Sequence, residues 1–72
     1  MEICKNKKTD KAFIYLDENR DGRALMITPM GHIMKLEQDL FTEPQDMDDA
    51  ESAHDQGHIN SAQYEAYCIY HQ

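Results

Sequence analysis

Four side chains in the C-terminal half have the chemistry of metal ligands. His54 and His58 are four residues apart, a spacing that puts two imidazoles on one face of a helix, and Cys68 and His71 follow three residues apart. Imidazole nitrogens and thiolates are preferred ligands of zinc. Gly57, however, indicates that the helix ends before His58, and no C-x-x-C pair is present. We therefore predict no metal or cofactor, and keep as the alternative a zinc-stabilised module that uses these four side chains.

The segment Asp17–Gly22 offers a second kind of ion site. Its sequence, D-E-N-R-D-G, begins like a calcium-binding loop, with oxygen ligands at the first, third and fifth positions. The twelfth position is Thr28 and not the bidentate glutamate that such a loop requires. Because the flanking residues favour strands, we predict that this segment is a hairpin turn.

Catalysis is not expected of this chain. Cys68 and His71 could pair a nucleophile with a base, but the sequence suggests no third group to orient them. It also has no Gly-rich phosphate loop and no nucleotide-binding fingerprint. We expect a domain of 72 residues to leave little room for a pocket of about 300 Å³, the lower size of small-molecule sites. The protein is therefore predicted not to be an enzyme.

Hydrophobic patterning predicts the elements that carry these side chains. Residues 11–17, 23–28 and 32–36 are rich in bulky aliphatic and aromatic residues, which favour strands, and turn-forming residues separate them. Three strands joined by tight turns predict an antiparallel β-meander over residues 11–36. Residues 1–10 are polar and basic, and are predicted to form a flexible or edge segment.

Residues 42–71 are predicted to form two helices that cover one face of the meander. Thr42 is suited to cap the first helix, with Gln45 as its capping-box partner, and Gly57 is suited to end it. The chain is thus predicted to be a single α+β domain of 72 residues, with a three-stranded antiparallel meander packed against a C-terminal helical hairpin.

The second helix is predicted over residues 61–71, with Asn60 and Gln63 as its capping box. Two sets of side chains lie on opposite sides of this helix: Ala62, Ala66 and Ile69 on one side, and Tyr64, Tyr67, Cys68 and His71 on the other. A surface helix normally has one apolar stripe, so two stripes indicate cover from both sides. We predict self-association into a homo-oligomer through the set that begins with Tyr64.

Charge is divided unevenly along the chain. All seven Lys and Arg residues precede Leu36, whereas nine of the fourteen acidic residues lie between Leu36 and Gln72. An ordinary solvated helix mixes both signs and gains ion pairs between successive turns. Because the C-terminal half has no Lys or Arg with which to form such pairs, we predict that a partner supplies the opposite charge.

The predicted partner-binding surface is an acidic ridge. It consists of Asp39, Glu43, Asp48, Glu51 and Asp55. We predict a small, non-catalytic protein-interaction module that binds a basic surface on another protein, and that acts as an inhibitor or regulator of a nucleic-acid-handling protein. Direct nucleic-acid binding is not expected, because the acidic half repels phosphate.

The sequence also suggests where the protein resides. No apolar run approaches the roughly 20 residues of a membrane span, and the polar start does not resemble a signal peptide. We therefore expect no membrane contact and a cytoplasmic location, where Cys4 and Cys68 stay reduced. The partner's identity and the oligomer size do not follow from the sequence.

Overall fold

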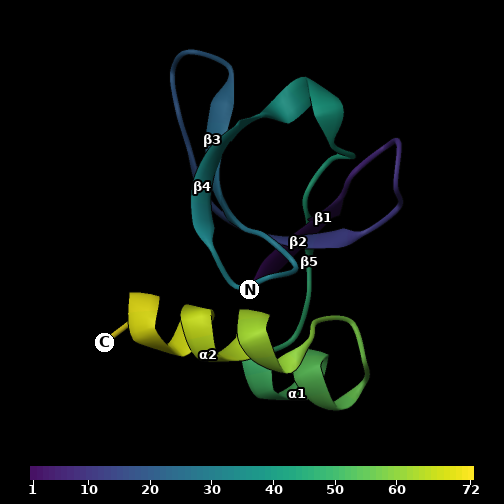
Figure 1. Ribbon diagram of the computed structural model, residues 1–72, viewed down its shortest axis with the longest axis vertical. Helices are drawn as coiled ribbons and strands as arrows, with labels where there is room; N and C mark the ends of the chain where they lie inside the picture. The colour runs from purple at the N-terminus through teal and green to yellow at the C-terminus, as the bar shows by residue number, and fades with distance from the viewer.

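The computed structural model describes all 72 residues and shows an α+β fold, as predicted (Figure 1). Five strands precede the helices: β1 (Glu2–Lys5), β2 (Ala12–Glu18), β3 (Arg23–Ile27), β4 (Ile33–Glu37) and β5 (Gln45–Asp46). A short 3₁₀-helix, η1 (Gln38–Leu40), separates β4 from β5. The chain ends with α1 (Ala50–Asp55) and α2 (Ser61–Tyr70).

The strands form one antiparallel sheet in the order β4-β3-β2-β1-β5. The predicted antiparallel meander of β2, β3 and β4 and the two C-terminal helices are confirmed, but the predicted number of three strands was wrong. The main correction is β1, which was expected to be flexible or at an edge and instead lies between β2 and β5. Ile3 pairs with Ile14 and Cys4 with Phe13, so β1 buries both of its central side chains.

The predicted start of the first helix was also wrong. The Thr42 hydroxyl accepts a hydrogen bond from the Lys5 amide at 3.0 Å and caps no helix. Gln45, its expected capping partner, pairs with Ile3 in β5. The helix begins later, where the Asp49 carboxylate accepts from the Ser52 amide at 2.8 Å. The pairing of this segment with β1 therefore overrides its local helix signal.

The predicted turns formed as expected. In the β2–β3 hairpin, the Asn19 amide donates to the Arg23 carbonyl at 2.8 Å, and Gly22 adopts a positive φ of 82°. Asp21 accepts from the Arg23 amide at 3.2 Å, so this carboxylate stabilises the turn. The segment that resembled a calcium loop is therefore part of a hairpin.

The two faces of the curved sheet carry two separate hydrophobic clusters. On the face covered by α1 and α2, Ile3, Ile14 and Ile27 pack with Ala53 and Ile59. On the other face, a second cluster consists of Cys4, Ala24, Met26 and Phe41. Figure 1 shows that the sheet curls upward from the helices and that η1 closes part of the opening. Only η1 and the segment after it, which includes Phe41, cover the second face, so this face remains partly open.

Hydrogen bonds fix α2 against the sheet. The predicted capping box of Asn60 and Gln63 is present, with both side chains bonded to the opposite backbone amide. The Asn60 amide group also donates to the Pro29 carbonyl at 2.7 Å, and the buried Gln63 amide donates to the Ala12 carbonyl at 2.9 Å. The start of α2 is thus bonded both to the β3–β4 turn and to the start of β2.

Candidate functional site

The uncovered face of the sheet contains two adjoining open hollows. Their volumes are about 250 Å³ and about 450 Å³, and both are lined by Tyr15, Gln38, Glu43 and Pro44. We call this combined surface the Tyr15 hollow. Its volume reaches that of small-molecule sites, so the expectation that the domain has little room for a pocket was wrong. The hollow is open to solvent and has more polar than apolar lining, which suits a side chain of a partner better than an enclosed ligand.

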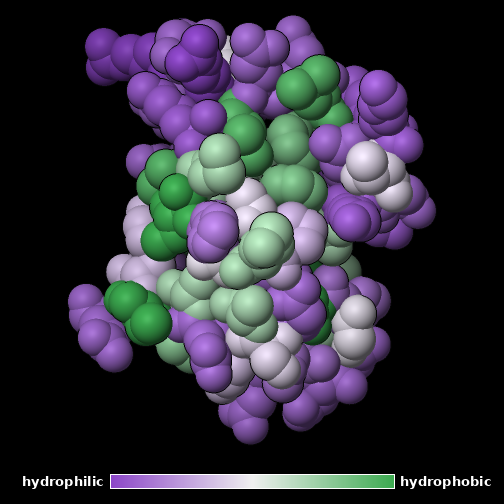
Figure 2. Space-filling view, in the orientation of Figure 1, coloured by the Kyte–Doolittle hydropathy of each residue, from purple (hydrophilic) through white to green (hydrophobic).

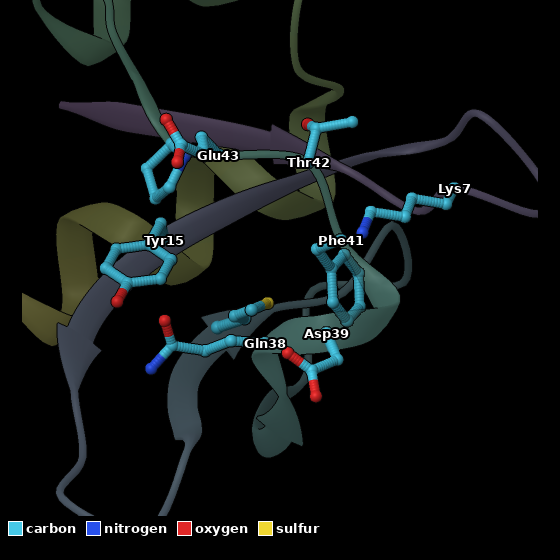
Figure 3. A pocket seen from close by; sticks show the side chains of 9 residues that line it. Lys7, Tyr15, Gln38, Asp39, Phe41, Thr42 and Glu43 are labelled. Carbon is cyan, nitrogen blue, oxygen red and sulfur yellow. The ribbon is translucent and has the colours of Figure 1, made fainter.

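Aromatic rings shape the interior of the hollow. Phe41 is 6 % exposed and meets Phe13 edge to face at 4.8 Å between ring centroids. Figure 3 shows the rings of Tyr15 and Phe41 on two sides of the hollow, with the Gln38 side chain between them. The site therefore offers an aromatic wall beside polar groups.

Backbone bonds hold η1 and the segment after it in place. The Gln38 amide donates to the Gly22 carbonyl at 3.0 Å, and its side chain donates to the Arg23 carbonyl at 3.0 Å. The Lys7 amide donates to the Leu40 carbonyl at 3.0 Å. One side of the hollow is thus tied to the β2–β3 turn and to the β1–β2 loop, so its shape is preformed.

Carboxylates dominate the polar lining of the hollow. Five acidic residues line it, namely Glu2, Asp17, Glu18, Asp39 and Glu43, and Lys7 is the single cation among the lining residues. The structure contains only two ion pairs, and neither involves these six side chains. The hollow is therefore an acidic surface that its own chain does not neutralise.

The electrostatics of the hollow are visible in the pKa of Tyr15. Burial raises the pKa of the Tyr15 phenol, and the negative charges of the Glu18, Glu2 and Asp17 carboxylates raise it further. The phenol thus remains protonated at neutral pH and can donate a hydrogen bond. A positively charged group would be attracted both by the carboxylates and by the aromatic face.

The structure divides the predicted acidic ridge into two groups. Asp39 and Glu43 line the Tyr15 hollow. Asp48, Glu51 and Asp55 lie on or just before α1, on the helix-covered side of the sheet (Figure 1). The five carboxylates consequently share no continuous surface, because β5 leads the chain from one side of the sheet to the other.

Three acidic residues of the hollow were missed by the sequence analysis. Glu2, Asp17 and Glu18 belong to the half of the chain that is basic overall. The two-residue spacing of Tyr15 and Asp17 is no signal for this site, because a β-bulge between them shifts the register and Asp17 pairs with Leu25, next to the Met26 that pairs with Tyr15. The approach of Glu2 to Glu43 depends on the pairing of β1 with β5, which no local pattern reveals.

The predicted self-association set has other contacts within the monomer. Tyr64 and Tyr67 are half-buried and pack against the hydrophobic cluster under the sheet. Cys68 and His71 are exposed, and His71 contacts the ring of Tyr67 at 4.4 Å between centroids. Self-association through this set remains a prediction, but its two tyrosines already stabilise the docking of α2.

The four candidate metal ligands are not brought together. His54 lies 3.1 Å from the Ser61 hydroxyl and stacks on Tyr64, while His58 lies 3.1 Å from the Gln56 side chain. No group of three or more His, Cys, Asp or Glu side chains has a geometry that could hold a metal ion. The structure therefore offers no support for the zinc-stabilised alternative.

Comparison of the chain with protein-family models, with curated proteins and with solved structures found no match. Neither α1 nor α2 has the length and apolar character needed to cross a membrane.

Proposed function

We propose that this protein is a small, non-catalytic interaction module that binds a basic surface of another protein through the Tyr15 hollow. The observation that carries the proposal is the absence of any ion pair at the five carboxylates of the hollow. Carboxylates held together without counter-ions repel one another, and an arriving lysine or arginine relieves that repulsion. Tyr15 and Phe41 add an aromatic wall against which a cation is stabilised.

The proposed partner class follows from this charge. Proteins that handle nucleic acids present basic surfaces for phosphate, and a negatively charged protein can occupy such a surface. We therefore propose that the protein inhibits or regulates a nucleic-acid-handling protein. The same charge disfavours direct binding of this chain to DNA or RNA.

Two triple variants with equal charge change test the role of the hollow. The hollow variant carries Glu2→Gln, Glu18→Gln and Glu43→Gln. The control variant carries Asp48→Asn, Glu51→Gln and Asp55→Asn. Each variant removes three negative charges, but on opposite sides of the sheet.

An arginine-rich synthetic peptide serves as the probe, and titration calorimetry gives its dissociation constant. We expect the hollow variant to bind about tenfold more weakly than the control variant, because close charge pairs contribute more than remote ones. Affinity for the wild-type protein should fall as salt is raised, since exposed charges are screened beyond about 8–10 Å. Equal weakening by both variants would show that net charge alone attracts the peptide and would refute the role of the hollow. Thermal melting of both variants verifies that the fold is intact.

A further inference from the structure

Exposed apolar side chains lie away from the Tyr15 hollow, on both faces of the edge strand β4 and at the end of α2. Among the large hydrophobic side chains, Ile33 is 43 % exposed, Met34 46 %, Ile69 65 % and Tyr70 39 %. Figure 2 shows hydrophobic residues gathered along the sheet edge formed by β4 and below it at the C-terminal end of α2. Exposed apolar surface of this kind usually marks a contact with another protein.

The backbone of β4 is open at the same place. β4 is the outer strand of the sheet, and its only sheet neighbour is β3. The Thr28 amide donates to the His32 carbonyl, and the Gln38 amide donates to the Gly22 carbonyl. These two bonds set the alternation of the ladder, in which the even-numbered residues from 32 to 38 are hydrogen-bonded to the β3 side. By the alternation of antiparallel ladders, the N–H and C=O groups of Ile33, Lys35 and Glu37 point away from β3. An unpaired row of this kind is a template for another strand.

The opposite edge of the sheet offers no equal template. β5 has only two residues, Gln45 and Asp46, and Pro44 directly before it lacks a backbone N–H. Short edge strands and proline are devices that prevent pairing between edges. β4 is therefore the one edge of the sheet suited to strand addition.

Charge favours a second copy of this chain as the occupant of that edge. The protein has a net charge of −7, which opposes contact between two copies over most of the surface. The charged residues of β4, however, are one lysine (Lys35) and one glutamate (Glu37), and α2 has no Asp, Glu, Lys or Arg after Glu65. This surface consequently carries little net charge and permits two copies to approach.

We propose that two copies pair antiparallel through β4, with the two-fold axis at Leu36. Residues opposite one another in an antiparallel pair point to the same face of the joined sheet, so they are an even number of positions apart in the sequence. The two-fold axis therefore passes through a residue and not between two residues. An axis at Leu36 places Lys35 of each copy opposite Glu37 of the other, so the interface contains two such pairs. An axis at Lys35 would place two lysines opposite each other, and an axis at Met34 would place Lys35 opposite Ile33. An axis at Glu37 would place two glutamates opposite each other. Among the registers centred on a residue of β4, only the one at Leu36 pairs Lys35 with Glu37 and places no like charges opposite one another.

A charge exchange tests this register. Lys35→Glu alone and Glu37→Lys alone each place like charges opposite one another at both symmetric positions, whereas the double variant restores opposite charges. By sedimentation across micromolar to submillimolar concentrations, we expect each single variant to weaken the dimer about tenfold or more and the double variant to recover it. Failure of the double variant to recover the dimer would overturn the proposed register.

A proline variant tests whether the backbone takes part. Glu37 has φ of −72°, which proline adopts without strain, and its N–H points into the open edge. Glu37→Pro should therefore keep the fold and melting temperature of the monomer while abolishing the dimer, whereas Glu37→Gln should weaken the dimer only slightly. A dimer that survives Glu37→Pro, or a wild-type protein that is monomeric at every concentration, would overturn the proposal.

Discussion

The two faces of the sheet solve the same packing problem in different ways. The face under α1 and α2 buries three isoleucines, one from each of β1, β2 and β3, against two helices. The opposite face relies on the curvature of the sheet, the ring of Phe41 and η1, and it leaves the Tyr15 hollow open. The first face is thus closed by two helices, whereas the second is only partly covered and can carry charges that would be unfavourable in a closed core.

Two neighbouring residues of β2 give the sharpest test of this difference. Ile14 is completely buried on the helix-covered face, and Tyr15 points to the hollow. Ile14→Ala should lower the free energy of unfolding by about 2–5 kcal/mol, a large part of the stability of so small a domain. Tyr15→Phe should change it by less than about 1 kcal/mol, because it removes one hydroxyl at an open site. Urea denaturation measures both, and equal losses would show that the two faces contribute alike.

The docking of the helices can be tested at the β3–β4 turn. Gly31 has φ of 82°, and an added Cβ would lie 2.8 Å from the Ala62 carbonyl oxygen in α2. Gly22 has the same φ, but no atom lies within 4 Å of the position that an added Cβ would occupy. Gly31→Ala should therefore cost about 2–4 kcal/mol, through backbone strain and displacement of α2, and Gly22→Ala only about 1–2 kcal/mol. Thermal melts compare the two variants, and equal costs would mean that α2 adapts freely to the turn.

The two cysteines report on the face opposite the helices. Cys4 is buried there beside the Met26 sulfur, and burial raises the pKa of its thiol from 9.0 to about 11, whereas Cys68 is exposed. At pH 8 a thiol reagent should modify Cys68 quickly and Cys4 only through opening of the fold. Two equally fast modifications would show that this cluster is not closed.

The same shift predicts how stability depends on pH. Because the folded state retains the Cys4 proton while the unfolded state has lost it, stability is fully present below pH 9 and declines by about 1.4 kcal/mol per pH unit between 9 and 11. Cys4→Ala should flatten this decline relative to the wild-type protein in urea denaturation at each pH.

Part of the fold was predictable because its signals are local. The turn at Gly22, the helix end at Gly57 and the capping box of Asn60 with Gln63 each depend on a few consecutive residues. Residue type alone largely sets such structures, since φ preference and side-chain caps act within one turn. The meander and the C-terminal helical pair followed from these signals together with hydrophobic alternation.

The candidate site was less predictable, because it depends on pairing between distant strands. Thr42 and Gln45 have the sequence pattern of a capping box, yet in the structure both residues bond to or pair with β1. Glu2 and Glu43 likewise meet at the hollow only after β1 enters the sheet.

By itself, the sequence determined the α+β class, the turns, the helix ends and the uneven distribution of charge. The tertiary structure decided which carboxylates share a surface, which face of the sheet stays open and that β1 is an interior strand. The physical reason is range: caps and turns are fixed by neighbouring residues, whereas strand pairing and sheet curvature balance burial over the whole chain. Charge composition led to the prediction of a basic partner, but only the curl of the sheet defines the hollow at which we propose that it binds.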